Sequence, residues 1–159
     1  MSKKQFTHIS KDGNPQMVNV SEKKITLRRA RAQAIIDVGD EILDKIENNE
    51  LITKKGPVFQ TAIIAGVMGG KKTADLIPFC HPLGLEDCQI KIHVQNRKIV
   101  IETETVVTAK TGVEMEALTA ASVAALTVYD MCKALSHNIV IQEIKLMAKS
   151  GGKKDFKRI

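Results

Sequence analysis

Asp130 and Lys133 are an acid and an amine three residues apart, in a segment that otherwise carries few charges. From Val113 onward no residue breaks a helix for roughly twenty positions, so the segment predicts one long helix. Side chains three residues apart on a helix lie within reach of each other. A carboxylate beside an amine can pass protons to and from a bound molecule. We therefore predict a coupled acid–base pair near the far end of this helix.

The two sides of the long helix differ when each residue is placed at about 100° around the axis. The polar side collects Glu116, Thr119, Ser122, Thr127, Asp130 and Lys133. The apolar side collects Ala117, Leu118, Ala121, Ala124, Ala125, Val128, Met131, Cys132 and Leu135. A solvated polar face is the general expectation for such a helix, but short Thr and Ser side chains suit a surface covered by something other than bulk water.

Glu116 and Asp130 share the polar side but lie about 21 Å apart along the axis, at about 1.5 Å per residue. One small ligand cannot easily touch both residues of a single helix. If both ends of the helix are functional, we expect a site between subunits, where each end serves a different copy of the chain.

The composition indicates a single globular domain over residues 1–159, with a mobile arm over 1–16 and a flexible basic tail over 150–159. No apolar run approaches the ~18 residues of a membrane span, so we expect no membrane contact. Three cysteines without CxxC spacing indicate free thiols and a cytoplasmic location. The net charge of +6 favours an anionic partner, whereas four Phe, one Tyr and no Trp are few for stacking on nucleic-acid bases.

The hydropathy pattern predicts an α+β fold. An ambiguous first segment is assigned as a strand, a short helix follows, and a second helix, apolar on nearly all sides, should be buried. A hairpin, the long helix and a last strand complete the order. We expect the first strand over residues 25–38, the two helices over 40–46 and 58–68, the hairpin over 88–107, the long helix over 113–133 and the last strand over 139–146. The order corresponds to a ferredoxin-like β-α-β-β-α-β sandwich, in which one antiparallel sheet carries helices on one face.

Residues 66–72 resemble a phosphate-binding loop but fail on count, because three residues instead of four separate Gly66 from Gly70. A looser anion site remains open, in which Gly69 and Gly70 allow close approach and Lys71 or Lys72 meets the anion. An ordinary helix end with basic residues is the alternative.

Metal and RNA sites receive little support. The candidate metal ligands lack the spacing of a metal site, so we predict neither a metal nor a cofactor; they are Cys80, His81, His93, Glu114 and Glu116. The strand over 98–104 carries acids and no aromatic residue, which excludes an RNA-recognition sheet. Pro78 and Pro82, by contrast, restrict the loop that carries Cys80 and His81.

Several segments, among them Cys-His-Pro-Leu at 80–83 and Lys-Thr-Gly-Val-Glu-Met-Glu at 110–116, together resemble the cyclic pyranopterin monophosphate synthase family, molybdenum cofactor biosynthesis protein C. The matching segments are 54–56, 64–68, 75–83, 110–120, 129–133 and 148–153. The resemblance implies a ferredoxin-like subunit in a homohexamer of three dimers, with active sites at subunit interfaces. It also implies conversion of a cyclised dihydroguanosine triphosphate into cyclic pyranopterin monophosphate, with release of pyrophosphate.

The resemblance further implies residue roles. Asp130 matches the catalytic acid, with Lys133 and Lys55 as essential lysines. The substrate pocket matches Phe79, Cys80, His81, Glu114, Met115 and Glu116, and basic positions in or near the site match Arg28, Lys71 and Lys149. This chemistry needs a base for a ribose hydroxyl and cations for the leaving pyrophosphate. Crowding of several lysines would favour a neutral amine on one of them.

The chain departs from the family pattern at Asn19 and Pro57, where Asp is usual or common, and at Gly69–Gly70, where alanines are usual. Two other functions therefore remain open. One is a nucleotide- or RNA-binding module without catalysis, and the other is a weakened family member kept as an assembly partner.

Overall fold

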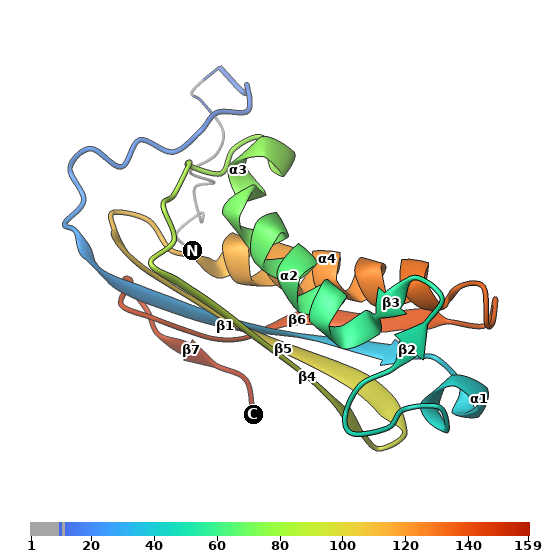
Figure 1. The fold of residues 1–159 in the computed structure, drawn as a ribbon. Helices are drawn as coiled ribbons and strands as arrows, with labels where there is room; N and C mark the ends of the chain where they lie inside the picture. Colours follow the sequence, from blue (N-terminus) through green and yellow to red (C-terminus); the bar gives the residue numbers. More distant parts are fainter. Residues whose placement is uncertain (1–9, 11) are drawn as a thin grey trace.

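The protein is described by a computed structural model that covers residue 10 and residues 12–159 (Figure 1). Residues 1–9 and 11 of the predicted arm lie outside the described residues. The elements are β1 (Thr26–Asp37), α1 (Asp40–Leu43), β2 (Ile52–Thr53), β3 (Gly56–Pro57), α2 (Val58–Lys71), α3 (Thr73–Leu76), β4 (Asp87–Gln95), β5 (Lys98–Ala109), α4 (Glu114–Cys132), β6 (Val140–Ser150) and β7 (Phe156–Lys157). The predicted first strand, hairpin, long helix and last strand are confirmed.

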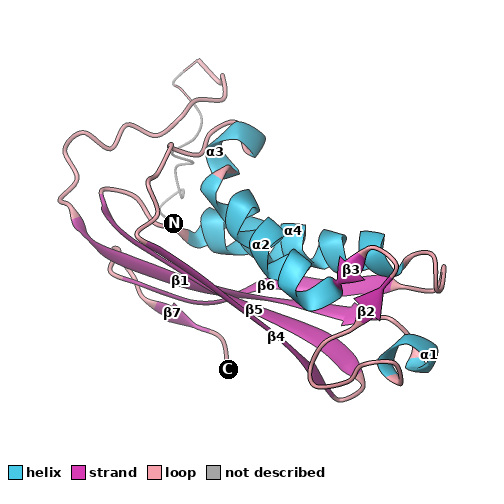
Figure 2. Cartoon of the chain, viewed as in Figure 1, coloured by secondary structure: helices cyan, strands magenta, loops and turns pink. Residues whose placement is uncertain are grey.

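An antiparallel sheet and four helices form the described part of this α+β fold. The strands lie in the order β4-β5-β1-β6-β7, and each neighbouring pair is antiparallel. Figure 2 shows α2 and α4 side by side on one face of the sheet. The short β2–β3 hairpin precedes α2 and lies beside the C-terminal end of α4 (Figure 1).

The centre of the sheet is built from small residues. Along β1, Ala30, Ala32, Ala34 and Ile36 alternate with outward-facing polar residues and are buried against the helix layer. The alanines at 117, 121, 124 and 125 of α4 are also fully buried. Small side chains on both layers let the helix approach the sheet closely. The predicted apolar side of α4 is thus confirmed except at Leu135, which follows the helix and is 38% exposed.

Two buried threonines fasten α4 to β5. Thr103 Oγ1 donates to the carbonyl of Ala117 at 2.8 Å, and Thr105 Oγ1 donates to the carbonyl of Val113 at 3.1 Å. Since the first turns of a helix contribute their carbonyls to the helix itself, these extra bonds tie the helix start to the sheet. They fix the position of Glu114 and Glu116, which lie in the same first turn.

The glycines of α2 form a helix–helix contact and not an anion site. The helix continues through Gly69 and Gly70 to Lys71, and both glycines are buried. A Cβ added to Gly69 would lie 2.6 Å from Val123 Cγ2, and one added to Gly66 would lie 2.9 Å from the Ala120 carbonyl oxygen. The looser anion-binding prediction is therefore wrong, because the backbone at Gly69 and Gly70 faces α4.

The predicted full burial of α2 is also wrong. Ile64 is 63% exposed and Met68 is 55% exposed, and Leu126 on neighbouring α4 is 59% exposed. An apolar helix in a two-layer fold buries only the side that meets the sheet and the next helix, so its outer side remains open. Among the described residues, no helix is long and apolar enough to cross a membrane.

The C-terminal residues fold back along the sheet. In β7, Phe156 pairs with Lys149 and Lys157 pairs with Ala148 of β6. The Arg158 amide then donates to the carbonyl of Met147 at 2.8 Å. The basic tail over 150–159 thus contributes a short edge strand.

Candidate active site

The three predicted catalytic residues meet at the C-terminal end of α4. Lys55 Nζ donates to Asp130 Oδ2 at 2.7 Å and to the Asp130 carbonyl at 2.9 Å. Lys133 Nζ lies 2.7 Å from Oδ1 of the same carboxylate. One carboxylate is therefore held between two amines, and all three side chains are about half exposed, at 47% for Lys55 and 54% for the other two.

Lys55 reaches this carboxylate from the tip of the β2–β3 hairpin. Thr53 Oγ1 accepts the Lys55 amide at 3.2 Å and donates to the Gly56 carbonyl at 3.3 Å. Gly56 has a φ of 110°, which only glycine adopts without strain. The Lys-Gly pair in the sequence therefore has a local reason, because the glycine completes the turn that presents Lys55.

The two lysines set the proton state of this cluster. Hydrogen bonds from Lys133 and then Lys55 lower the pKa of Asp130 to about 2. The hydrogen bond to Asp130 in turn raises the pKa of Lys133 above its usual value. Asp130 is therefore an anion and Lys133 a cation at neutral pH, so Lys133 is not the lysine on which a neutral amine is favoured.

The predicted substrate pocket forms at the other end of α4. A cavity of about 400 Å³ is lined by Val18, Val20, Lys23, Phe79, Cys80, His81, Leu83, Thr111, Gly112, Glu114, Met115 and Glu116. The loop between α3 and β4 and the first turn of α4 supply the six residues that the resemblance assigned to a pocket. The structure thus brings those six together.

Glu116 is the buried acid of this cavity. Its exposed fraction is 4%. Burial, which disfavours the charged form, raises the pKa of Glu116 to about 7, and the nearby Glu114 adds to the rise. Burial also raises the pKa of the Cys80 thiol, and Glu116 contributes. Glu116 and Thr119 on the predicted polar side are both buried within the chain itself.

His81 binds the segment before β1. Its Nε2 lies 2.8 Å from the carbonyl oxygen of Val18. Because a carbonyl oxygen can only accept, Nε2 carries the proton, and Nδ1 of a neutral ring is left as an acceptor. Lys110 Nζ donates to the Ser21 carbonyl at 2.7 Å and holds the same segment. Val18, Val20 and Lys23 of this segment form a wall of the cavity that the sequence pattern did not indicate.

A second, basic cavity adjoins the first. It measures about 290 Å³ and is lined by Lys23, Arg28, Arg29, Lys110, Thr111, Gly112, Val113, Glu114, Lys149, Ser150, Gly152 and Lys153. Lys149 Nζ bonds Glu114 at 2.8 Å, and Arg28 Nε lies 3.5 Å from the Ala109 carbonyl. Arg28 and Lys149 were predicted, whereas Lys23, Lys110 and Lys153 were not. In the sequence, only the positive net charge pointed to these three lysines, although Lys110 and Lys153 also lie inside the segments that resemble the family.

Lys71 lies apart from these two cavities. It lines a smaller hollow of about 90 Å³ at the end of α2, which also touches Glu116. The cluster of Asp130, Lys55 and Lys133 is further away, since Glu116 and Asp130 are separated by about 21 Å of helix. Within one chain, the predicted site residues therefore fall into two groups at opposite ends of α4.

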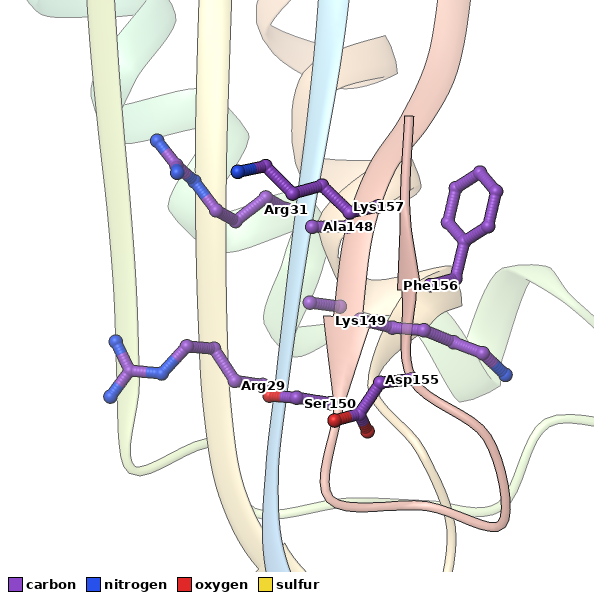
Figure 3. A pocket seen from close by; sticks show the side chains of 9 residues that line it. Arg29, Arg31, Ala148, Lys149, Ser150, Asp155, Phe156 and Lys157 are labelled. Atoms are coloured by element: carbon purple, nitrogen blue, oxygen red, sulfur yellow. The ribbon is translucent and has the colours of Figure 1, made fainter. Parts of the chain in front are cut away.

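A further cavity of about 420 Å³ lies over β1, β6 and β7 (Figure 3). In Figure 3, Arg29 and Arg31 extend from β1 across β5 and Lys157 extends across β1, while Phe156 and Lys149 point the other way. Arg29 and Arg31 both bind Glu104, and the Lys149 amine binds Glu114. This cavity shares Arg29, Lys149 and Ser150 with the basic cavity.

The part of the chain that the structure describes holds no group of three or more His, Cys, Asp or Glu side chains arranged for a metal ion. The three cysteines are free thiols. Burial raises the pKa values of all three thiols.

The α+β fold places ion-paired side chains at each end of its longest helix, Glu114 with Lys149 at one end and Asp130 with Lys55 and Lys133 at the other. Residues 17–152 match the MoaC family, and the chain belongs to this family. The resemblance noted in the sequence is thereby confirmed.

The relatives carry related names. The chain is 44% identical to "Molybdenum cofactor biosynthesis protein 1" of Dictyostelium discoideum, 49% to "Molybdenum cofactor biosynthesis bifunctional protein" of Synechocystis sp. and 48% to "Molybdenum cofactor biosynthesis protein 1" of Drosophila melanogaster. The alignments cover 98%, 94% and 97% of this chain but 28%, 45% and 27% of the relatives. The chain thus spans less than half the length of these relatives.

Proposed function

We propose that this protein converts a cyclised dihydroguanosine triphosphate into cyclic pyranopterin monophosphate and pyrophosphate, as a phosphorus–oxygen lyase of molybdenum cofactor biosynthesis. The observation that carries the proposal is the Asp130 carboxylate held at 2.7 Å by both Lys55 and Lys133, in a chain of the MoaC family. Relatives named for molybdenum cofactor biosynthesis support the pathway.

The two adjoining cavities suit the two parts of this substrate. A triphosphate needs several cations, and Lys23, Arg28, Lys110 and Lys153 line the basic cavity. A guanine-like ring needs hydrogen-bond partners in an enclosed pocket, and the larger cavity offers His81 beside Glu116. With a pKa of about 7, Glu116 can donate or accept a proton at a ring nitrogen near neutral pH.

The cluster at the other end of α4 supplies the reacting groups. Asp130 is ionised and can take the proton of a ribose hydroxyl, while cationic Lys133 can stabilise charge on phosphoryl oxygens. These roles require the cluster to meet the cavities. Because one chain separates them by about 21 Å, we propose that the complete site combines the pocket of one copy with Asp130 of another.

A homo-oligomer follows from this arrangement, and we propose the hexamer of three dimers that the family resemblance implies. A two-fold axis would create two equivalent composite sites from one contact. Ile64, Met68 and Leu126 are apolar, exposed and located on the outer side of the helix layer, which supports burial against another copy. The strand order β4-β5-β1-β6 with α2 and α4 on one face supports a ferredoxin-like subunit. The free thiols suit a cytoplasmic location.

Turnover tests the function. Purified protein incubated with the cyclised nucleotide should release pyrophosphate, and Lys133→Ala should abolish the release while the circular dichroism spectrum stays unchanged. Lys145→Ala is a matched control, because Lys145 also forms an exposed ion pair, with Glu143, on a different element. Binding of substrate without any turnover would overturn the proposal and leave an assembly or binding role.

A further inference from the structure

The carboxylate of Glu50 closes the hairpin that carries Lys55. Glu50 Oε1 accepts the amides of Leu51 and Phe59, each at 2.8 Å, and Oε2 accepts the amide of Gln60 at 3.1 Å. One side chain therefore holds the chain just before β2 and just after β3. The Val58 amide, which donates to the Leu51 carbonyl at 2.9 Å, closes the same loop through the backbone.

Glu50 also caps the N-terminus of α2, because the residue directly before the helix cannot. The residue before α2 is Pro57, whose side chain has no acceptor. Phe59 and Gln60 lie in the first turn of α2, where amides have no partner within the helix. A carboxylate that accepts two such amides satisfies them and interacts favourably with the positive end of the helix dipole. The hydrogen bonds of the Glu50 carboxylate thus hold the base of the hairpin, before β2 and after β3.

The backbone of Glu50 is itself fixed. Asn48 and Asn49 have φ values of 50° and 56°, and Glu47 and Glu50 exchange two backbone hydrogen bonds across this turn at 2.9 and 3.0 Å. Asn49 Nδ2 reaches the Ile92 carbonyl on β4 at 3.3 Å. The anchor is therefore tied to the sheet, while Lys55 at the tip makes both of its bonds to Asp130.

We propose that Glu50 is a positioning residue for the Asp130 cluster, which fixes the hairpin so that the Lys55 amine stays on the Asp130 carboxylate. This inference rests on the proposed function for its catalytic consequence. Glu50 acts through Lys55, because the hairpin between them is short and its two ends are held by the Glu50 carboxylate. A displacement of about 1 Å at a reacting group can cost about a hundredfold in rate.

Steady-state kinetics of wild type and five variants test the catalytic consequence. Glu50→Ala should lower kcat about 10- to 100-fold with little change in KM, and Glu50→Gln, which keeps one acceptor oxygen, should recover part of the loss. In a Lys55→Ala background, Glu50→Ala should lower kcat no further, because contacts that act as a unit are not additive. Glu47→Gln, a change of an exposed acid in the same turn, is the control and should leave kcat unchanged.

Carboxyl NMR can monitor the titration of Asp130, whose pKa depends on the hydrogen bond from Lys55. This measurement needs no catalytic turnover. Glu50→Ala should raise the pKa of Asp130 in the same direction as Lys55→Ala does, because both remove the Lys55 hydrogen bond. If wild-type protein fails to turn over but this shift is present, the proposed function fails and the positioning role stands. An unmoved Asp130 titration in folded Glu50→Gln and Glu50→Ala, or a kcat loss that adds fully to that of Lys55→Ala, would overturn the positioning role.

Discussion

The two ends of α4 carry carboxylates whose pKa values move in opposite directions. At the N-terminal end, Glu116 is buried at 4% exposure and its pKa rises to about 7. At the C-terminal end, the side chain of Asp130 is 54% exposed and its pKa falls to about 2. Loss of water dominates at the first site and two neighbouring amines dominate at the second.

The comparison shows how one helix can provide two different chemical environments. The N-terminal end has a cavity, but its buried carboxylate, Glu116, keeps its proton to near neutral pH. The C-terminal end has an ionised carboxylate between two amines, but it lies on an open surface. A pair of acids with pKa values pushed apart can divide donor and acceptor roles. Each end has what the other lacks, which is why the proposed site joins them across two copies.

The largest effect is expected from Asp130→Asn, which leaves the amines but removes the charge between them. We expect kcat to fall by about 10²–10⁴-fold, because a general base is lost, while the fold persists since the side chain is half exposed. Pyrophosphate release in a coupled assay measures the change. A kcat within about tenfold of wild type would show that this end of α4 is not the reacting end.

Mixing two inactive variants tests whether the ends work across copies. Copies with Asp130→Asn, unfolded and refolded together with copies carrying His81→Ala, should regain about a quarter of wild-type activity, because half of the random dimers contain one intact composite site of two. Each variant treated alone is the control. Absence of recovery, with mixed oligomers present by native mass spectrometry, would show that the two ends do not combine across copies.

Next in size is the effect of Glu116→Gln on stability. The folded-state pKa of about 7 lies above the ordinary 4.5, so the wild-type free energy of unfolding should fall as pH rises from about 4.5 to 7. Gln cannot ionise, so the variant should lack this fall and be more stable than wild type by roughly 2 kcal/mol at about pH 8. Urea unfolding at several pH values measures it. Parallel curves for the two proteins would contradict the assignment of the buried proton to Glu116.

Arg28→Ala tests whether the basic cavity near the N-terminal end of α4 binds phosphate groups. Loss of one guanidinium from the basic cavity is expected to weaken binding of inorganic pyrophosphate about tenfold, as judged by calorimetry. Arg97→Ala is the matched control, because Arg97 pairs with Asp40 and Asp44 outside both groups of site residues. Equal weakening by both substitutions would mean that only the net charge matters.

The smallest effect concerns acid stability at the exposed end. The pKa of Asp130 is lowered from 3.8 to about 2, so its ion pairs should stabilise the fold above about pH 4 and lose that contribution as pH falls toward 2. The free energy of unfolding of Asp130→Asn should therefore fall slightly less than that of wild type as pH decreases from about 4 toward 2. Because the pair is exposed, salt near 1 M should remove most of the difference, and a difference that survives would imply a buried cluster.

Local pattern predicted much of the fold. The alternation along 25–38 and 88–107 and the apolar spacing of the long helix depend on backbone geometry within a few residues, and the strands and α4 appear where expected. The Asp130–Lys133 contact follows from helical spacing in the same way. The resembling segments likewise named the pocket residues that line the larger cavity.

Long-range packing decided the rest. The sequence alone could not bring Lys55 to Asp130, 75 residues away, nor the Val18 carbonyl to His81. It also misplaced Gly69 and Gly70, whose meaning depends on α4 lying against them. The raised pKa of Glu116 exists only because the tertiary fold removes water from that carboxyl.

Sequence by itself therefore determined which groups are present and which of them share a helix face, because helix and strand periods are set by the local backbone. Tertiary structure decided which of those groups are buried, which are paired and how their protons are held, because desolvation and ion pairing depend on residues that are distant along the chain.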